Sequence, residues 1–350
     1  MSSAGSLRLR LLSMVIISAV LASCGPREPD FPRLTGDYLG QTPPGEVPEL
    51  FAPGIVSTGM YVRDIAMTPD GGELYYGVAL GNFTVIMQAK RVGGVWTKPE
   101  VAPFAANPEH FSFEPHISPD GQRFFFLSNR PRDGGTMPDD QRGQWVNEDI
   151  WVMDRAQDGW SEPYNLGPPV NTDSSEFFPS VTNDGTLYFT RSFPDGRSFI
   201  YRARPTAAGF APPQRLPVQV NSTNAQYNAF IAPDESYLIV PVFGREDSYG
   251  RTDYYIVFRN MNDEWSEPVN MGDRVNTPRN GEYSPFVSRD GKYFFFMSTR
   301  GSSWEGVPDA LTHEYLWSVF SAPQNGNSDI YWVQAAFIEQ LRSTARWGPE

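Results

Sequence analysis

The sequence predicts an all-β chain that folds as a β-propeller, and three observations carry this prediction. A unit of two short apolar runs around a tight turn recurs five times along the chain. Third and fourth strand-like runs follow most copies at similar spacing. The composition agrees, because 24 Phe, 16 Tyr and 9 Trp are residues that strands favour, and 31 Gly with 32 Pro supply many turns.

The recurring unit is clearest between Gly281 and Gly301, where an Asp-Gly turn joins two apolar runs. An Asp-Gly pair between alternating apolar runs predicts a β-hairpin. The copies align on their turn aspartates, which are Asp70, Asp120, Asp184, Asp234 and Asp290. Their spacing of 50 to 64 residues is close to the periods of propellers and solenoids. The fourth copy has Glu235 in place of the glycine, so we expect its turn to be of another type.

Each copy continues with a third run, and four copies have a fourth. The third runs begin at Asn82, Glu148, Ser198, Thr252 and Ser328, and the fourth runs at Val95, Gly159, Gly209 and Glu264. A proline lies within each fourth run, as suits an edge strand, where the missing N–H breaks no ladder bond. Four antiparallel strands with such an edge form a propeller blade.

The fifth copy lacks a fourth run, but an orphan segment near the N-terminus, VPELFAPGIVS at residues 47–57, has that pattern. We therefore predict five four-stranded blades, with this N-terminal strand closing the last blade; a sixth, degenerate blade is the alternative. Closure would remove the exposed edges of the end blades. The predicted propeller spans residues 47–340, and a tail spans residues 341–350.

The first residues predict export. Arg8 and Arg10 precede an apolar run that is too short to span a bilayer and is typical of a signal peptide. The sequence LASC then ends at Cys24, the only cysteine in the chain, and it resembles a bacterial lipobox. We expect a signal peptide over residues 1–23, acylation of Cys24, and a Pro- and Gly-rich tether over residues 24–46. The alternative is an ordinary signal peptide with a chance cysteine.

Charge and the residue after the cysteine bear on location and partners. Gly25 stands where lipoproteins retained in the inner membrane often carry Asp, which favours the outer membrane. The formal net charge is −13, and removal of the signal peptide makes it more negative. Such a charge disfavours nucleic acid and anionic lipid surfaces as partners. We expect a monomer that contacts the membrane through its lipid anchor only.

Two pairs of segments resemble a known repeat. SPDGQRFFFLSNR followed by EDIWVMDR, and RDGKYFFFMSTRG followed by SDIYW, are similar to the WD40-like, TolB-type β-propeller repeat of bacterial envelope proteins. The resemblance covers about residues 47–340 and implies a propeller fold. The family includes scaffolds, binding modules and the propeller domains of some peptidases, so the resemblance implies no single activity.

Polar residues stand six or eight positions before the turn aspartates, and we place them near the axis on one face of the ring. They are Asp64, Glu114, Glu176, Glu282 and the neutral Asn228. The second runs end on the same face with Arg130, Arg191 and Arg300. Arginine beside a carboxylate forms planar, bidentate pairs. Either these residues pair with each other and seal the blade tops, or they line an axial pocket for a small anionic or hydroxylated ligand.

Two loops between second and third runs are much longer than the others, and long loops in compact domains are often functional. One begins at Pro131 and the other at Gly301. The second loop contains Trp304, Tyr315 and Trp317, an aromatic cluster suited to stacking on a sugar or a peptide. The alternative is that its stretch ALTHEYLWSVF forms a short helix packed over the ring as a lid.

The chain shows no strong motif for catalysis or metal binding. His110 and His116 lie close in sequence, but their spacing matches no strong zinc motif, and we expect no metal or other cofactor. A Gly-X-Ser-X-Gly elbow is missing, which argues against a peptidase. We therefore expect an envelope lipoprotein whose propeller binds a protein or a glycan without catalysis. The alternative is a propeller enzyme or carbohydrate-binding protein that acts on a polysaccharide through axial carboxylates.

Overall fold

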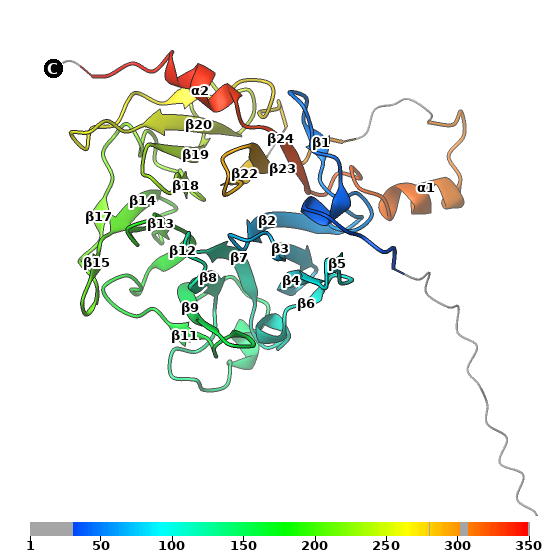
Figure 1. Ribbon diagram of the computed structural model, residues 1–350, viewed down its shortest axis with the longest axis horizontal. Helices are drawn as coiled ribbons and strands as arrows, with labels where there is room; N and C mark the ends of the chain where they lie inside the picture. Colours follow the sequence, from blue (N-terminus) through cyan, green and yellow to red (C-terminus); the bar gives the residue numbers. More distant parts are fainter. Residues whose placement is uncertain (1–30, 280, 302–306, 349–350) are drawn as a thin grey trace, which may run out of the picture. The chain divides into compact units, whose positions relative to one another are not determined.

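The computed structural model describes residues 31–279, 281–301 and 307–348. From Arg33 onward the chain forms one compact unit. Within the described residues the main sheets are five antiparallel blades of four strands each, set around a common axis (Figure 1). The prediction of a five-bladed, all-β propeller is confirmed.

The three inner strands of each blade follow the predicted runs. The strands of each blade are given below in order from the axis outward. Blade 1 contains β2 (Tyr61–Met67), β3 (Glu73–Leu80), β4 (Phe83–Val92) and β6 (Glu100–Val101), with β5 (Val95–Trp96) also paired to β4. Blade 2 contains β7 (Ser112–Ile117), β8 (Arg123–Ser128), β9 (Asp149–Ala156) and β11 (Tyr164–Asn165), with β10 (Gly159–Trp160) also paired to β9. Blade 3 contains β12 (Ser175–Val181), β13 (Leu187–Ser192), β14 (Ser198–Ala203) and β17 (Gln214–Arg215).

The last two blades have the same order. Blade 4 contains β18 (Phe230–Ile231), β19 (Tyr237–Phe243), β20 (Thr252–Phe258) and β21 (Val269–Asn270). Blade 5 contains β22 (Glu282–Val287), β23 (Tyr293–Ser298), β24 (Asp329–Gln334) and β1 (Glu49–Leu50). A small ribbon of β15 (Pro205–Thr206) and β16 (Gly209–Phe210) extends the outer part of blade 3.

Prolines account for the short outer strands. In blade 1, β5 pairs with β4 at Val92 and β6 pairs with it at Met87, and the chain between β5 and β6 contains Pro99. Proline has no N–H for a ladder, so it interrupts pairing without leaving a buried donor unsatisfied. The fourth strand of this blade is therefore divided into two short pairings.

The ring closes through the N-terminal segment. β1 pairs antiparallel with β24, with Glu49 opposite Trp332. Phe51 continues this pairing, because its N–H donates to the carbonyl of Ile330 at 2.9 Å. The ring of Phe51 is fully buried and packs edge-on against Trp332, with the ring centroids 5.2 Å apart. The predicted closure of the last blade is confirmed.

The ordered body begins earlier than the expected end of the tether. η1 (Tyr38–Gly40) packs on blade 5, where the ring of Tyr38 lies 5.2 Å from that of Trp332. Leu39 is buried in the core between blades 5 and 1. Trp96 of blade 1 donates its backbone N–H to the carbonyl of Leu34 at 2.9 Å. Residues 33–46 therefore belong to the body and not to a free tether, because their apolar side chains find a core. The expected signal peptide and Cys24 lie outside the described residues.

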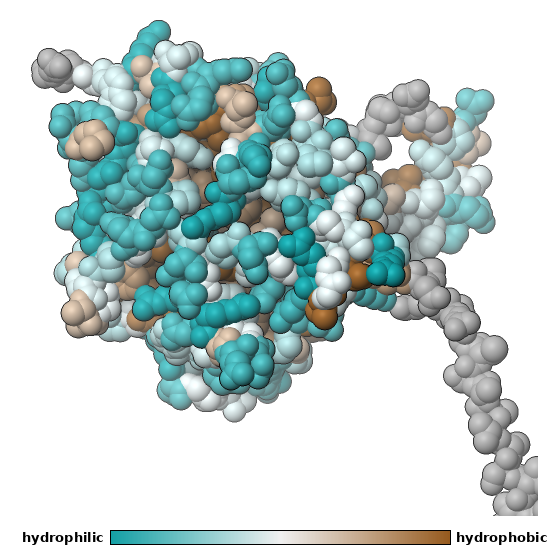
Figure 2. All heavy atoms as spheres, viewed as in Figure 1, coloured by the Kyte–Doolittle hydropathy of each residue, from teal (hydrophilic) through white to brown (hydrophobic). Residues whose placement is uncertain are grey.

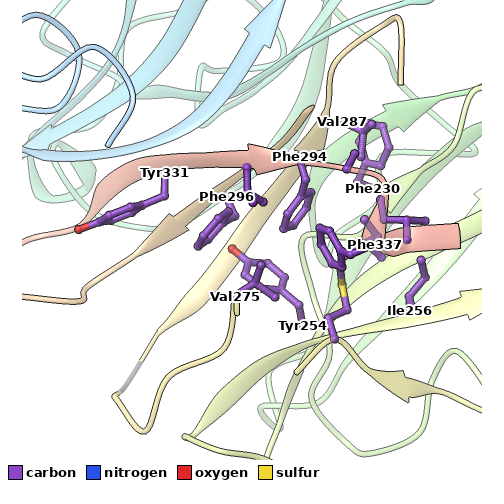
Figure 3. Close-up of a cluster of buried hydrophobic side chains, with 14 of the residues drawn as sticks. Phe230, Tyr254, Ile256, Val275, Val287, Phe294, Phe296, Tyr331 and Phe337 are labelled. Atoms are coloured by element: carbon purple, nitrogen blue, oxygen red, sulfur yellow. The ribbon is translucent and has the colours of Figure 1, made fainter. Parts of the chain in front are cut away.

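Hydrophobic cores fill the seams between neighbouring blades. The core between blades 4 and 5 is rich in aromatic side chains and includes Phe230, Tyr254, Phe294 and Phe296 (Figure 3). α2 (Phe337–Arg342) follows the last strand and adds Phe337 to the same core. Corresponding clusters join blades 1 and 2, 2 and 3, 3 and 4, and 5 and 1. Apolar burial at every seam holds the ring as one body.

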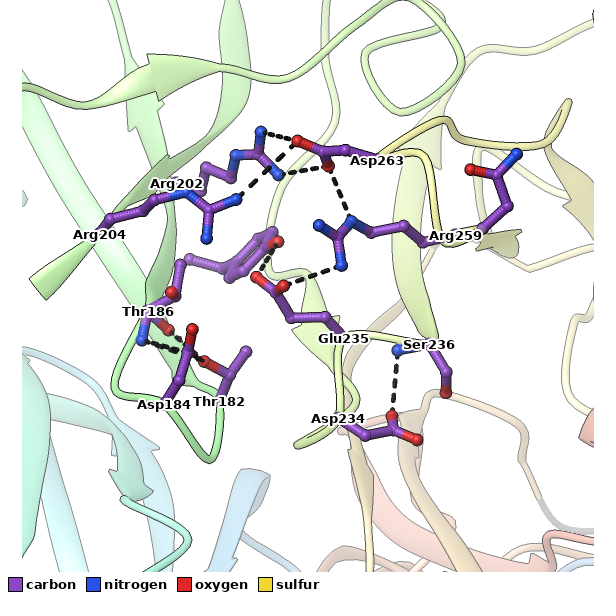
Figure 4. A network of polar contacts seen from close by, with 12 residues as sticks. Thr182, Asp184, Thr186, Arg202, Arg204, Asp234, Glu235, Ser236, Arg259 and Asp263 are labelled. Carbon is purple, nitrogen blue, oxygen red and sulfur yellow. Dashed lines mark hydrogen bonds and ion pairs between the residues drawn. The ribbon is translucent and has the colours of Figure 1, made fainter.

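The fourth turn corrects the sequence prediction. Glu235 adopts a φ of 59°, in the left-handed range of the glycines that follow the turn aspartates of the other blades. Its N–H donates to the carbonyl of Ala232 at 2.8 Å, as in the other turns. Its buried side chain accepts a hydrogen bond from Tyr188 and pairs with Arg259 at 2.9 Å (Figure 4). The expectation of another turn type is wrong, because these contacts offset the strain of a non-glycine residue in this conformation.

Two further short elements lie in the long loops. η3 (Asp139–Gln141) belongs to the loop between β8 and β9, and α1 (His313–Phe320) belongs to the loop between β23 and β24. A 3-10 turn, η2 (Pro103–Ala105), follows β6. Among the described residues, the structure contains no helix long and apolar enough to cross a membrane.

Candidate functional site on the loop face

The innermost strands share a backbone feature that aims side chains at the axis. Each blade has a residue with left-handed backbone six positions before its turn aspartate, and in four blades a shift in the strand register spans that residue. The five residues and their φ values are Asp64 (58°), Glu114 (53°), Phe178 (51°), Asn228 (51°) and Ser284 (66°). A β-bulge of this kind re-aims a side chain, and such strain often marks a functional site.

Arg63 joins two of these residues. Its Nε lies 2.8 Å from the carboxylate of Asp64, and its Nη2 donates to Oε1 of Glu114 at 2.9 Å. The guanidinium also lies over the rings of Phe113 and Tyr283, 5.0 and 4.5 Å from their centroids. One arginine therefore contacts two carboxyl groups and is held between two aromatic rings.

Glu114 is bound on both carboxylate oxygens. Besides Arg63, Asn228 donates to Oε1 at 3.3 Å, and the backbone N–H of Phe178 donates to Oε2 at 2.8 Å. Burial raises the pKa of Glu114 to about 8, against the opposing effect of Arg63, and burial also raises the pKa of Asp64. Only 3% of Asp64 and 5% of Glu114 is exposed, so neither carboxylate faces an open cleft.

Glu176 and Glu282 occupy a different tier, eight positions before their turn aspartates. Glu176 is fully buried, accepts from Thr172 and pairs with Nε of Arg191 at 2.6 Å. Glu282 is also fully buried and accepts from Thr277 at 2.6 Å, and burial raises its pKa to about 7. The structure therefore does not bring Glu176 and Glu282 into the cluster of Asp64 and Glu114. The sequence reading had grouped all four.

The three arginines at the ends of the second strands make equivalent contacts. Arg130, Arg191 and Arg300 donate to the carbonyls of Phe104, Val170 and Val275, which lie in the segments leading into the same blades. Each guanidinium also lies over aromatic rings of its own blade. The sequence alternative in which acids and arginines pair with each other is met by Arg191, which pairs with Glu176. Arg130 and Arg300 fasten the entry segments of their blades through backbone carbonyls instead.

A cavity on this face lies beside the long loop that begins at Pro131. Its volume is about 600 Å³, and that of a cavity on the opposite, turn-bearing face is about 460 Å³. It is open to solvent and is bounded by blades 2 and 3. Its lining is mostly polar and includes Asn129, Arg130, Arg132, Asp133, Thr136, Met137, Gln141, Asn147, Asp149, Thr172, Asp173, Ser174 and Ser175. We call it the loop-face cleft. Amide, hydroxyl and charged groups in one concave site suit a polar ligand.

The floor of the loop-face cleft is held rigidly. Arg132 binds Asp149 with Nε at 2.6 Å and Nη2 at 2.8 Å, and Asn165 donates to the same carboxylate at 2.8 Å. The side chain of Asp173 is fully exposed at the rim and lies 3.8 Å from Nη1 of Arg132. Buried, paired groups and exposed groups together provide an ordered surface with room for contacts to a partner.

The aromatic residues predicted in the second long loop do not meet the axial residues. Tyr315 and Trp317 lie on α1, and Trp317 is 61% exposed. Trp304 lies outside the described residues. The stretch does form the short helix given as the alternative, but α1 buries none of its residues against the ring, so it is not packed as a lid. An aromatic residue that the sequence reading missed is Trp145, which stacks near Phe111 with centroids 4.7 Å apart.

His110 and His116 lie partly buried in the body of the propeller. His116 is in the strand next to the axis and accepts a hydrogen bond from the N–H of Val181 at 3.0 Å. Burial lowers the pKa of both His110 and His116 to about 4. Within the described ranges, no three or more His, Cys, Asp or Glu side chains are grouped so as to hold a metal ion.

A second cavity near this face is apolar. It has a volume of about 420 Å³ and lies at the end of blade 1. Its lining includes Met60, Val78, Leu80, Phe83, Val85, Met87, Val101, Ala105 and Phe111. We call it the blade 1 groove. The turn between β3 and β4 forms one side of it, and Leu80 and Phe83 of this turn are largely exposed.

Comparisons with known proteins agree on fold. No protein-family model matches the chain, and no curated protein sequence matches it. Solved structures that are similar include a putative TolB from Agrobacterium tumefaciens, with 14% identity, a TM-score of 0.43, and coverage of 79% of this chain and 90% of that one. The native arabinanase Arb43A of Bacillus subtilis has 12% identity, a TM-score of 0.46, and coverage of 80% and 96%. An exo-1,5-alpha-L-arabinanase from a bovine ruminal metagenomic library has 15% identity, a TM-score of 0.42, and coverage of 78% and 92%. At these identities the likeness concerns the fold alone.

Proposed function

We propose that the protein is a bacterial envelope lipoprotein whose propeller binds a polar segment of an envelope protein or a glycan, without catalysis. The observation that carries the proposal is the division of the loop face into two parts. At the axis, Arg63 binds the buried side chains of Asp64 and Glu114 inside the body. Beside it, the loop-face cleft presents unburied polar groups at the surface. Binding therefore belongs to the cleft, and the axial cluster sets the geometry of the ring.

The axial carboxylates support a non-catalytic role. Two carboxylates that cleave a glycosidic bond must flank the sugar, one of them as an acid and the other as a nucleophile or base. Here one guanidinium bridges both groups, and their side chains are 1% and 5% exposed. A sugar would have to displace Arg63 to reach them. Hydrolysis of a glycan that disappears in Glu114→Gln would favour the enzyme alternative.

A filled cleft tests the binding site. Ser174 lies in the loop-face cleft, and Ser174→Trp would occupy it with an indole. The matched control is Asn183→Trp, in the cavity on the turn-bearing face. We expect wild type and the control to bind a component of an envelope extract saturably, and Ser174→Trp to lose that binding while its melting temperature stays unchanged. Protease treatment of the extract should remove the ligand if it is a protein, and periodate treatment should remove it if it is a glycan.

Equal binding by Ser174→Trp and wild type would contradict the assignment of the cleft. Loss of binding in both tryptophan variants would also count against it, because the control leaves the cleft open. Binding is measured with protease-treated and with periodate-treated extract, so that the outcome separates a protein partner from a glycan.

The anchor has its own test. Cys24 ends the lipobox-like sequence, and acylation there would hold the body at the envelope, in our proposal at the outer membrane. Because attached acyl chains supply the membrane affinity, Cys24→Ser should abolish labelling with a palmitate analogue and release the protein into the soluble fraction. Labelling that persists in this variant would show that the lipoprotein assignment is wrong.

A further inference from the structure

α1 presents an apolar face that the described body does not cover. Leu316, Trp317 and Phe320 are 53%, 61% and 61% exposed, and the rings of Trp317 and Phe320 lie 5.4 Å apart. None of the residues of α1 is buried. Its charged and titratable groups, His313, Glu314 and Tyr315, are in its first turn. Large apolar side chains gathered on one exposed helix usually mark a surface that meets another apolar phase.

The end of α1 is nevertheless fixed to the propeller. The carbonyl of Phe320 approaches Gly59 so closely that a side chain at Gly59 would collide with it. Asn325 donates to the carbonyls of both Gly59 and Phe320, at 2.9 and 2.7 Å. Asn327 donates to Gly59 at 2.8 Å. These bonds hold the end of the helix at the start of blade 1.

A second apolar surface lies on blade 1, next in sequence to the point where α1 is fixed. Met60, the neighbour of Gly59, lines the blade 1 groove together with Leu80 and Phe83. Leu80 and Phe83 are 61% and 58% exposed. Figure 2 shows hydrophobic side chains on the surface of the segment that carries α1. We call α1 together with the blade 1 groove the apolar edge. Neither α1 nor the groove lining contains a lysine or an arginine.

The root of the N-terminal segment lies on the same blade. Leu34 and Gly36 accept hydrogen bonds from the backbone and the indole of Trp96, at 2.9 and 2.7 Å. Cys24 precedes Leu34 by ten residues, and ten extended residues span at most about 35 Å. A lipid on Cys24 would therefore keep blade 1 within about 35 Å of the bilayer surface.

We propose that the apolar edge inserts into the interface of the bilayer that carries the Cys24 anchor, so that the lipid and the edge together orient the propeller. The proposal rests on the proposed lipoprotein function. Trp and Phe on an amphipathic helix are suited to the boundary between headgroups and acyl chains. With no basic residue in the edge and an acidic chain, the contact is hydrophobic and not electrostatic. The proposal goes beyond contact through the lipid anchor alone.

The experiment uses the unacylated chain from Gly25 to Glu350, which keeps every strand of the five blades, and vesicles of phosphatidylcholine and phosphatidylethanolamine. We expect it to float with the vesicles at low and at high salt. The combined variant Leu316→Ser, Trp317→Ser and Phe320→Ser should bind roughly tenfold more weakly or worse, because three large apolar side chains no longer insert. The matched control replaces three exposed apolar residues of blades 3 and 4, Val218, Tyr249 and Met261, by serine. It should bind like wild type.

Three outcomes would overturn the proposal. They are failure of the unaltered chain to float, equal flotation of the α1 variant, and a dimer in lipid-free solution that disappears in the α1 variant. The last outcome would assign the edge to contact between copies. Melting temperatures of both variants should match wild type, because the replaced residues are exposed; the single variant Trp317→Ser serves if the combined one unfolds. The chain tested carries no lipid. A negative acylation assay would therefore contradict the lipoprotein assignment but would leave the flotation result to be judged separately.

Discussion

The conformation of Glu114 is fixed by the neighbouring residues and not by the backbone preference of a glutamate. Its left-handed backbone is unfavourable for a glutamate, yet Arg63, Asn228 and the N–H of Phe178 all bind its carboxylate. The surroundings that hold the side chain also remove it from water. The result is a carboxyl group that resists ionisation at neutral pH in the folded chain.

This pKa predicts how stability changes with pH. Burial raises the pKa of Glu114 to about 8 in the folded state. Between the ordinary pKa of a glutamate and about pH 8, the folded chain therefore keeps a proton that the unfolded chain has lost. Stability should therefore fall as pH rises, by roughly 1–2 kcal/mol between about pH 6.5 and 8. Glu282, with a pKa of about 7, acts in the same direction over the lower part of this window. The measurement is the free energy of unfolding in urea at several pH values.

Glu114→Gln should make this fall shallower, because the group that titrates is gone. Glu246→Gln, an exposed glutamate, is the control and should keep the wild-type slope. His110 and His116 oppose the trend only below their ordinary pKa, because burial lowers their pKa to about 4. A Glu114→Gln slope as steep as that of wild type would mean that Glu114 is ionised in the folded protein.

At the scale of an element, the N-terminal segment contributes both a strand to blade 5 and side chains to the neighbouring hydrophobic core. β1 completes blade 5, and η1 places Tyr38 and Leu39 in the seam between blades 5 and 1. The residues before Arg33 belong to a separate unit. The segment is therefore an integral part of the propeller from Arg33 onward, although its composition is that of a linker.

Truncation tests where the body begins. A chain that starts at Arg33 should melt like one that starts at Gly25, because no described contact of the propeller is lost. A chain that starts at Val47 loses Tyr38 and Leu39 and should be less stable by about 2–5 kcal/mol, the usual effect of removing a large buried side chain. Thermal melts compare the three chains. Identical melting of all three would show that the η1 contacts contribute nothing to stability.

At the scale of the whole molecule, the strands were predictable because their signals are local. Alternating apolar runs and turn aspartates mark each hairpin, and the missing fourth run identified the closing strand before any contact was known. The axial cluster was harder to predict. The residues six and eight positions before a turn aspartate look equivalent in sequence, but the left-handed residue separates Glu114 from Glu176.

Other features depend on contacts that sequence does not display. Arg63 was not singled out, although it stands next to Asp64, because only the fold brings Glu114 and Tyr283 to it. Glu235 takes a glycine conformation because Arg259 and Tyr188, far away in the chain, hold its side chain. The loop-face cleft arises where one long loop meets the next blade, and loop length alone does not give its lining.

The pairing of β1 with β24 has a consequence for the order of events during synthesis. Glu49 leaves the ribosome well before its partner Trp332, because the strands of the other four blades lie between them in the sequence. The first strand therefore stays unpaired while four blades emerge, and the ring closes only when the chain is free as far as Trp332. Contacts between such distant residues form slowly, and an unpaired strand edge is prone to association with other chains in the meantime. The nascent chain is therefore most prone to association just before its last blade is synthesised. A chain truncated before β24 would leave β1 without its pairing partner.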